Sequence, residues 1–246
     1  HRSQKFSVHA HPLTVPLSPH MLVSQHFTLT RSPAFIAFEG INGCGKTTLH
    51  KLLSAKVAAK GYSVCDTREP GGTLLGAEIR KLLLDWTGEK KSSRAELLLF
   101  AADRAEHVEK VIRPNLEQGT WVLTDRYIYS TITFQGHGRG IDRQLLDQAN
   151  ALAIQGTLPD LVILLDLGPT EAFKRIASRN SSARDSFEDE ELAFHTRIRE
   201  GFLECAKESP VPFLVLDARK TPEELCAEAA RACGLYTPFP LPPKDD

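Results

Sequence analysis

The clearest chemical signal in the chain is the segment from Gly40 to Thr47. It reads Gly-Ile-Asn-Gly-Cys-Gly-Lys-Thr and matches G-x-x-x-x-G-K-[ST] in full. Glycines let the backbone wrap closely around phosphate oxygens, so that its N–H groups can donate to them. Lys46 adds a point charge, and the Thr47 hydroxyl is a suitable ligand for Mg²⁺. We therefore predict a nucleotide-phosphate site formed by Gly40, Ile41, Asn42, Gly43, Cys44, Gly45, Lys46, Thr47 and Thr48.

A second segment, Thr67-Arg68-Glu69-Pro70-Gly71-Gly72-Thr73, follows the second predicted strand. Arg68 lies there at a strand end, beside the phosphate loop. Its planar guanidinium could bind a phosphate group of a second substrate through two parallel hydrogen bonds. A plain surface ion pair between Arg68 and Glu69 is the alternative.

A third segment, Asp125-Arg126-Tyr127, follows the third predicted strand and leads to Ser130 and Phe134-Gln135-Gly136. Asp125 can sit near a metal ion, and Arg126 can neutralise charge between donor and acceptor phosphates during transfer. Asp166 ends another apolar run. Spacing alone does not choose between the two aspartates.

The second and third segments closely resemble the thymidylate kinase family, whose signatures are T-R-E-P-G-G-T and D-R-Y-x-x-S-x-x-A-Y-Q-G. The resemblance extends from Ala34 to about Cys233. It implies ATP as donor, dTMP as acceptor, Mg²⁺ as cofactor, direct in-line transfer in dTTP synthesis, and a homodimer. It favours Asp125 over Asp166 and gives catalytic roles to Lys46, Asp125 and Arg126. The acceptor residues it implies are Asn42, Arg68, Arg126, Ser130, Phe134 and Gln135, with Thr47 and Asp125 at the metal.

The helical segment ending in Phe100-Ala101-Ala102-Asp103-Arg104 resembles the family's nucleobase-contacting helix. By that resemblance, Phe100 stacks on the thymine ring, and Arg104, one turn further along, donates to its carbonyl edge. The alternative is that Phe100 belongs to the core, as an aromatic residue at helical spacing usually does.

The polar stretch Arg179–Ser186 resembles a lid that closes over ATP, excludes water and supplies an arginine. Arg184 is our candidate catalytic residue, with a solvated loop charge as the alternative, because the family's D-R-[FI]-E appears here as Asp185-Ser186-Phe187-Glu188. Gly43 is the residue that the family carries when the lid provides this charge.

Two more positions depart from the family pattern. Asn42 stands where the family commonly has a carboxylate, and Thr133-Phe134-Gln135-Gly136 replaces A-Y-Q-G and lacks the tyrosine hydroxyl. We expect the Asn42 amide oxygen to accept a hydrogen bond from the 3′-hydroxyl of the acceptor sugar, without the charge that a carboxylate would add.

Short apolar runs alternate with longer helical segments from Ala34 onward, which predicts parallel strands joined by right-handed helical crossovers. The fold class is therefore α/β: a three-layer P-loop kinase fold with a central five-stranded parallel sheet and a short lid. The predicted strands are Ala34–Glu39, Tyr62–Asp66, Thr120–Thr124, Asp160–Asp166 and Pro212–Leu216.

The two ends of the chain differ in composition from residues 34–234, which we expect to form one kinase domain. Residues 1–33 contain no Asp or Glu and carry five of the nine histidines, which favours a disordered arm. Its origin has three alternatives: vector-derived residues, translation from upstream of the natural start, or a targeting segment. The proline-rich stretch 235–246 is predicted to be a disordered tail.

The composition of the whole chain limits the classes of partner. A formal net charge of −1 gives no electrostatic reason to expect nucleic acid or an anionic membrane. No apolar run approaches the length of about 18 residues that a spanning helix needs. Five widely spaced cysteines without a C-x-x-C pair fit a reducing compartment, so we expect a cytoplasmic protein.

Rival functions also use phosphate loops. A kinase for another nucleotide or a deoxynucleoside is the nearest alternative, and Arg68 argues for an acceptor that already carries phosphate. The chain has no N-K-x-D segment, which a nucleotide-dependent switch would need, and no basic stripe, which a DNA-directed ATPase would need. A non-catalytic nucleotide-binding module is the remaining alternative, because of Asn42 and Ser186.

Overall fold

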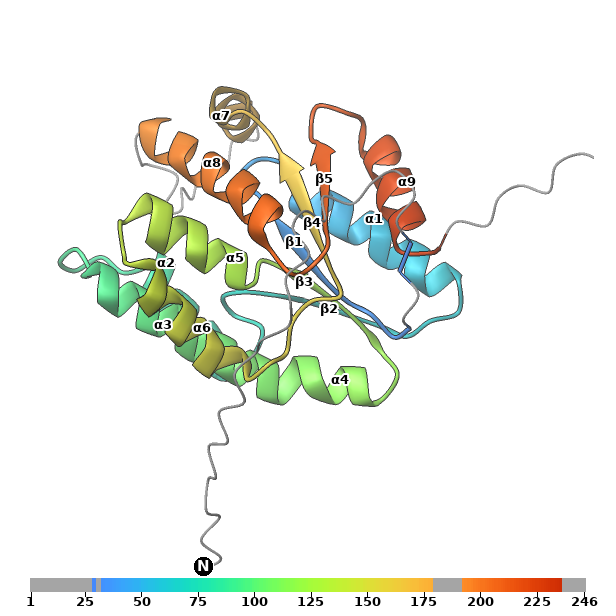
Figure 1. The fold of residues 1–246 in the computed structure, drawn as a ribbon, viewed down its shortest axis with the longest axis horizontal. Coiled ribbons are helices and arrows are strands. Elements are labelled where there is room, and N and C mark those ends of the chain that lie inside the picture. The colour runs from blue at the N-terminus through green and yellow to red at the C-terminus, as the bar shows by residue number, and fades with distance from the viewer. Residues whose placement is uncertain (1–27, 30–31, 179–191, 236–246) are drawn as a thin grey trace, which may run out of the picture.

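The computed structural model describes residues 28–29, 32–178 and 192–235. Five strands in this part of the chain form one parallel sheet with the order β2-β3-β1-β4-β5 (Figure 1). The predicted five-stranded parallel sheet is confirmed. The strands are β1 (Phe35–Glu39), β2 (Val64–Arg68), β3 (Trp121–Asp125), β4 (Leu161–Asp166) and β5 (Phe213–Asp217).

Helices cover both faces of the sheet, with α1 and α9 on one side and α8, α5 and α3 on the other (Figure 1). The central strands β1, β3 and β4 are almost wholly buried, as apolar strands between two helical layers must be. The α-helices are α1 (Lys46–Ala59), α2 (Leu74–Leu84), α3 (Ser93–His107), α4 (Arg113–Glu117), α5 (Ile128–Thr131), α6 (Arg143–Ile154), α7 (Pro169–Ser178), α8 (Leu192–Glu208) and α9 (Pro222–Ala232), and the π-helical segments are η1 (Val108–Ile112) and η2 (Ile132–Gly138).

The register of the strands brings three functional segments to one edge of the sheet. Arg68 at the end of β2 is paired with Asp125 at the end of β3, and Phe38 of β1 is also paired with Asp125. The carboxyl ends of parallel strands are where open α/β sheets bind ligands. The phosphate loop, Arg68 and Asp125 therefore meet although they are far apart in the sequence.

The second strand needs a correction. The sequence predicts Tyr62–Asp66, whereas β2 is Val64–Arg68. Thr67 and Arg68 remain in the strand because their backbones continue the parallel pairing with β3 as far as Asp125. The other four strands differ from their predicted bounds by no more than one residue at either end.

Three residues outside the predicted domain bounds of 34–234 contact the domain. Leu29, placed in the disordered arm, packs against the core, and its N–H donates to the carbonyl of Ala232 at 2.8 Å. Ser32, also placed in the arm, accepts a hydrogen bond from the Trp121 indole at 3.1 Å. Leu235, placed in the tail, is buried at 7% exposure. Sequence composition missed these contacts because each one depends on a distant partner.

Among the helices that the structure describes, none combines the length and the apolar character needed for a membrane span.

Candidate active site

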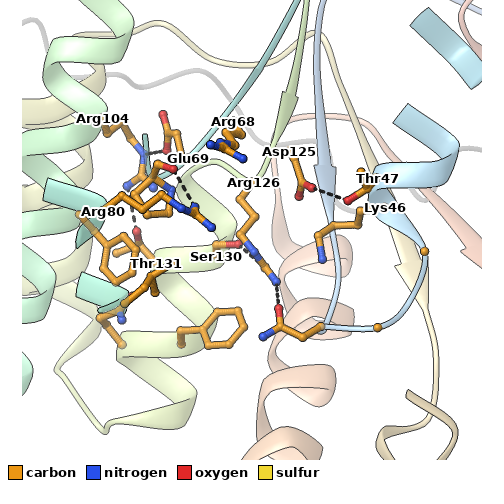
Figure 2. Close-up of a pocket in the computed structure, with 18 of the residues that line it drawn as sticks. Lys46, Thr47, Arg68, Glu69, Arg80, Arg104, Asp125, Arg126, Ser130 and Thr131 are labelled. Carbon is orange, nitrogen blue, oxygen red and sulfur yellow. Dashed lines mark hydrogen bonds and ion pairs between the residues drawn. The ribbon is translucent and has the colours of Figure 1, made fainter. Parts of the chain in front are cut away.

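A cavity of about 300 Å³ lies at the carboxyl edge of the sheet, between the phosphate loop and the helices α2 and α3. Figure 2 shows its lining side chains converging from the loop, from the ends of β2 and β3, and from the neighbouring helices. The structure brings together in this lining all eight residues predicted to contact the acceptor. They are Asn42, Arg68, Phe100, Arg104, Arg126, Ser130, Phe134 and Gln135.

The phosphate loop has a conformation that only glycine adopts readily at three positions. Gly40, Gly43 and Gly45 have φ angles of 134°, 80° and 105°. A Cβ atom on Gly43 would also lie 2.8 Å from the carbonyl oxygen of Ala172 in α7, so the close packing of α7 excludes a side chain there. The loop leads directly into α1, whose amino end has no side-chain cap. Its N–H groups therefore remain available to an anion.

The ammonium group of Lys46 lies within this loop. The side chain is 7% exposed, and its ammonium group donates to the carbonyl oxygens of Gly40 at 3.0 Å and Ile41 at 3.1 Å. A phosphate bound by the loop would meet this charge at close range.

Thr47 at the start of α1 and Asp125 at the end of β3 lie next to each other in the cavity lining. The Thr47 hydroxyl donates to Asp125 Oδ2 at 3.4 Å (Figure 2), and Asp125 Oδ1 is buried without a hydrogen-bond partner among the described residues. The described part of the chain has no cluster of three or more His, Cys, Asp or Glu side chains that could hold a metal ion alone. Mg²⁺ is usually held by one or two protein ligands together with substrate phosphates, and this pair fits that pattern.

Arg126 links the phosphate loop to the turn that follows β3. Its Nη1 donates to the Gly40 carbonyl at 3.1 Å and to the Ser130 hydroxyl at 3.0 Å, and its Nη2 donates to Asn42 Oδ1 at 2.5 Å. The guanidinium carbon also lies 5.0 Å from the centre of the Phe134 ring. The cation is therefore fixed between the phosphate loop and the turn after β3.

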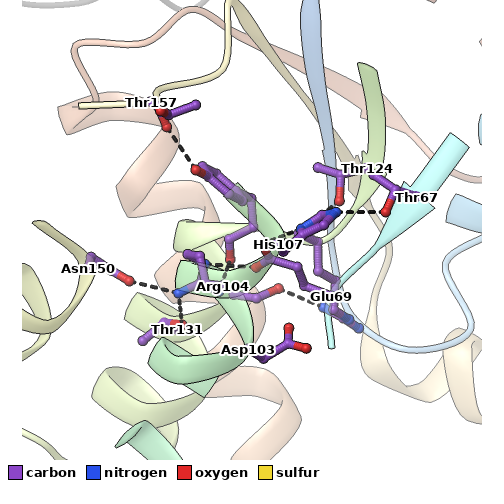
Figure 3. A network of polar contacts seen from close by, with 12 residues as sticks. Thr67, Glu69, Asp103, Arg104, His107, Thr124, Thr131, Asn150 and Thr157 are labelled. Atoms are coloured by element: carbon purple, nitrogen blue, oxygen red, sulfur yellow. Dashed lines mark hydrogen bonds and ion pairs between the residues drawn. The ribbon is translucent and has the colours of Figure 1, made fainter. Parts of the chain in front are cut away.

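Arg68 and Glu69 are neighbours in sequence but have separate environments. Arg68 is exposed, and its side chain makes no hydrogen bond or ion pair to any residue that the structure describes. Glu69 is 4% exposed and accepts from Arg104 Nε at 2.7 Å, with His107 Nδ1 at 2.9 Å (Figure 3). The alternative of an Arg68–Glu69 surface pair is therefore excluded, and the Arg68 guanidinium can reach a ligand.

Arg104 is largely committed to the protein. It is 2% exposed, and besides Glu69 it donates to Thr131 Oγ1 at 2.8 Å, Asn150 Oδ1 at 2.9 Å and the Tyr127 carbonyl at 3.1 Å (Figure 3). A guanidinium has five N–H groups, so at most one remains for a ligand. Phe100 is half-buried at the cavity rather than in the core. Both predicted nucleobase contacts stay predictions.

The comparisons with known proteins agree with this geometry. The family model described as thymidylate kinase matches residues 38–229. A thymidylate kinase of Nitratidesulfovibrio vulgaris is 43% identical over 214 residues, which span 85% of this chain and 100% of the relative. A thymidylate kinase of Solidesulfovibrio magneticus is 46% identical over 200 residues, 79% of this chain and 95% of the relative.

A crystal structure of thymidylate kinase from Ehrlichia chaffeensis matches with a TM-score of 0.65 and 36% identity, covering 81% of this chain and 97% of that one. The chain belongs to the thymidylate kinase family. Its reaction is the ATP-dependent phosphorylation of dTMP, a phosphotransferase activity, and no finding favours another acceptor or a non-catalytic module.

Sequence reasoning missed Glu39, a buried carboxylate of this kinase that contacts Ser130 of the cavity lining. It ends β1 directly before the phosphate loop and is 0% exposed. It accepts hydrogen bonds from the N–H groups of Tyr127 at 2.9 Å and Ser130 at 3.1 Å, and from the Ser130 hydroxyl at 2.6 Å. Burial raises its pKa to about 7, against the opposing effect of Arg126. The available signal was a carboxylate closing an otherwise apolar strand.

Sequence reasoning also missed the α3 side chains that hold the segment after β2. Asp103 Oδ1 accepts from the Gly71 N–H at 2.9 Å, and His107 Nε2 lies 2.7 Å from Thr67 Oγ1 (Figure 3). A Cβ atom on Gly72 would lie 2.6 Å from the His107 ring, so this close approach requires glycine. Burial and the nearby Glu69 carboxylate raise the pKa of Asp103 to about 6. These contacts hold Thr67 and Gly71, which lie on either side of Arg68 in the sequence.

Two further predictions concern Asp166 and the lid. Asp166 accepts two hydrogen bonds from Arg199 of α8, at 2.6 Å and 2.9 Å, and is not part of the cavity lining. Of the two aspartates, only Asp125 lines the cavity, and its role near a metal ion stays a prediction. The predicted lid Arg179–Ser186 and its candidate Arg184 lie outside the described residues.

Proposed function

We propose that this cavity transfers the γ-phosphoryl group of ATP to dTMP with Mg²⁺, in a single in-line step. The observation that carries the proposal is the convergence of all eight predicted acceptor residues with the phosphate loop in one cavity. No covalent intermediate is required, so rate enhancement rests on positioning and electrostatics.

On the donor side, the backbone from Gly40 to Thr48 and the amino end of α1 would hold the ATP phosphates. Lys46 would place its charge on the transferring group. Thr47 and Asp125 would hold Mg²⁺ together with phosphate oxygens, and their contact at 3.4 Å supports this assignment. The ion would offset the negative charge that builds up between the phosphates.

On the acceptor side, Arg68 would bind the phosphate of dTMP, because its guanidinium lines the cavity and has no other partner among the described residues. Arg126 would neutralise charge between the two nucleotides, supported by its bonds to Gly40 on one side and Ser130 on the other. Gln135 is 1% exposed, and its Nε2 has no partner within the described chain, so it offers a donor to the ligand. Phe100 would stack on the base.

The catalytic set would be Lys46, Asp125 and Arg126, joined by Arg184 from the lid. Arg184 rests on the family resemblance alone, because its surroundings are outside the described residues.

A homodimer is the proposed assembly. Leucines with large exposed fractions lie on three neighbouring helices: Leu74 of α2 at 93%, Leu98 of α3 at 64% and Leu152 of α6 at 77%. Figure 1 shows these helices side by side on one flank of the molecule. A second copy of this chain would bury such side chains at a favourable free energy of about 25 cal/mol per Å².

A cytoplasmic location is the proposed compartment. It is supported by the five cysteines, all unpaired in the structure, of which Cys44, Cys205, Cys226 and Cys233 are buried.

A panel of acceptors tests the proposed reaction. ADP release coupled to a reporter enzyme should need Mg²⁺ and be greatest with dTMP among the monophosphates and nucleosides. Lys46→Ala should lower kcat by about 10² or more, because its charge acts mainly in the transition state. The exposed Lys51 on α1 is a matched control, and Lys51→Ala should retain parental kcat. Equal or faster turnover with thymidine would contradict the proposal.

A further inference from the structure

The Glu39 carboxylate connects β1 to the turn that carries Arg126. Its three hydrogen bonds reach residues 88 and 91 positions away in the sequence. Oε1 accepts from two backbone N–H groups, of Tyr127 and Ser130, and Oε2 accepts from the Ser130 hydroxyl. A carboxylate is suited to this position because, when ionised, it only accepts hydrogen bonds.

The direction of each bond in the chain from Arg126 to Glu39 is determined by chemistry. A guanidinium has no acceptor atom, so the Ser130 oxygen must accept from Arg126 Nη1 at 3.0 Å. The Ser130 proton then points to Glu39 Oε2, at 2.6 Å. Each charged end of this chain strengthens the neighbouring bond.

The backbone at Arg126 needs such support. Its φ of 75° lies in the left-handed region, which is unfavourable for a residue with a long side chain. Glu39 holds the N–H groups of Tyr127 and Ser130, the first of which directly follows Arg126. The same residue thus fixes both the backbone turn and, through Ser130, the guanidinium.

We infer that Glu39 is the positioning residue of Arg126: it holds the turn after β3 and, through the Ser130 hydroxyl, aims the guanidinium between the ATP and dTMP phosphates. This inference rests on the proposed function of the cavity. Glu39 itself touches neither nucleotide, and its effect should therefore appear in kcat more than in the Michaelis constant for ATP.

The ionisation of Glu39 provides a readout that packing alone would not give. Its pKa is raised to about 7 because burial outweighs the opposing Arg126, Ser130, Tyr127 and Lys46. Tyr129 of α5 and Cys205 of α8 also act electrostatically on Glu39, and burial raises the pKa of both, so they stay neutral near pH 7. Protonation would place a donor against the Ser130 hydroxyl and weaken the bond chain.

The test compares the parent, Glu39→Gln, Ser130→Ala and the double variant with saturating ATP and dTMP. Glutamine keeps the side-chain volume of glutamate but can place an amide N–H donor where the Oε2 acceptor faces Ser130. We expect Glu39→Gln to lower kcat by about tenfold to a hundredfold in the parent and by less than about threefold when Ser130 is alanine. The Michaelis constant for ATP should change by less than about threefold. Equal losses in both backgrounds would overturn the inference.

The dependence of kcat on pH gives a second measurement. In the parent, kcat should fall toward acid with a midpoint near 7, and Glu39→Gln should lack this fall. If Glu39→Gln does not fold, the parent and Ser130→Ala are compared instead, and an identical acid limb in both would overturn the inference. A parent that does not phosphorylate dTMP would overturn the proposed function as well. An active parent with an unchanged Glu39→Gln profile would overturn only the role of Glu39.

Discussion

Arg126 donates a hydrogen bond to the amide oxygen of Asn42, which joins the turn after β3 to the phosphate loop. The same oxygen is the one expected to accept a hydrogen bond from the 3′-hydroxyl of the acceptor sugar. An amide oxygen has two lone pairs, so the bond to Arg126 leaves room for one more donor. The Asn42 amide oxygen can therefore accept hydrogen bonds from both Arg126 and the sugar hydroxyl, but it lacks the charge of the family's usual carboxylate.

The first prediction tests this double role with Asn42→Asp. A charge-assisted bond is stronger than a neutral one by roughly 1 kcal/mol, about fivefold in an equilibrium constant. The loss in kcat/KM on replacing dTMP by its 3′-deoxy analogue should therefore be larger in Asn42→Asp than in the parent. The comparison cancels effects of the new charge on bound phosphates, because both acceptors carry the same phosphate. An equal loss in both proteins would mean that position 42 serves Arg126 alone.

The second prediction concerns Arg68. Its Ala variant should raise the Michaelis constant for dTMP by about 10 to 100-fold, because a charge-assisted two-pronged contact contributes roughly 1.5 to 3 kcal/mol. The Michaelis constant for ATP should change little, since Arg68 ends β2 and is not part of the phosphate loop. Arg94→Ala on the exposed side of α3 is the matched control and should match the parent in both constants. An unchanged constant for dTMP in Arg68→Ala would remove Arg68 from the acceptor site.

The third prediction concerns assembly. A glutamate in place of Leu98 or Leu152 should convert a dimer to a monomer at micromolar concentration, because the interface would bury an unpaired charge. Sedimentation equilibrium measures this directly. Lys110→Glu on η1, which also places a glutamate at an exposed position, should leave the dimer intact. A parent that sediments as a monomer would contradict the proposed homodimer.

The fourth prediction concerns residues 28–32, at the end of the predicted arm. Removing residues 1–32 should lower the melting temperature by about 3 °C or more relative to removing 1–27, because the shorter chain loses the Leu29 packing and the Ser32–Trp121 bond. A loss of roughly 1 kcal/mol shifts the melting temperature of a domain of this size by about 2 to 4 °C. Scanning calorimetry of the two truncated chains checks it, and equal melting temperatures would show that residues 28–32 add nothing to stability.

The sequence predicted the parts of the site whose chemistry is local. The phosphate loop was predictable because its glycines, Lys46 and Thr47 lie in one short segment. The five strands were predictable from their apolar runs. The contacts of Glu39, Asp103 and His107 could not be read, because each depends on a partner brought near by the register of the sheet or by helix packing. Arg104 shows the same limit: the family resemblance predicts a ligand contact, while its side chain donates to Thr131 and Asn150, which are distant in the sequence.

The last prediction is the effect of pH on the stability of the protein without substrates. The pKa of Glu39 is about 7 in the folded chain and near 4.5 in the unfolded chain. Between these values the folded state binds a proton that the unfolded state has lost, so the free energy of unfolding falls as pH rises. The contribution is fully present below about pH 4.5 and is lost as pH rises through 7.

At 1.36 kcal/mol per pKa unit, this contribution is on the order of 3 kcal/mol. Glu39→Gln has no such proton, whereas Asp103, which titrates in the same direction, is present in both proteins. The difference in unfolding free energy, parent minus variant, should therefore fall by about 2 to 3 kcal/mol between pH 4.5 and 7.5. Urea titrations at several pH values, with equal m-values required of both proteins, measure it. A difference that stays constant with pH would show that Glu39 is already ionised at acid pH, and the acid limb expected for kcat would then need another source.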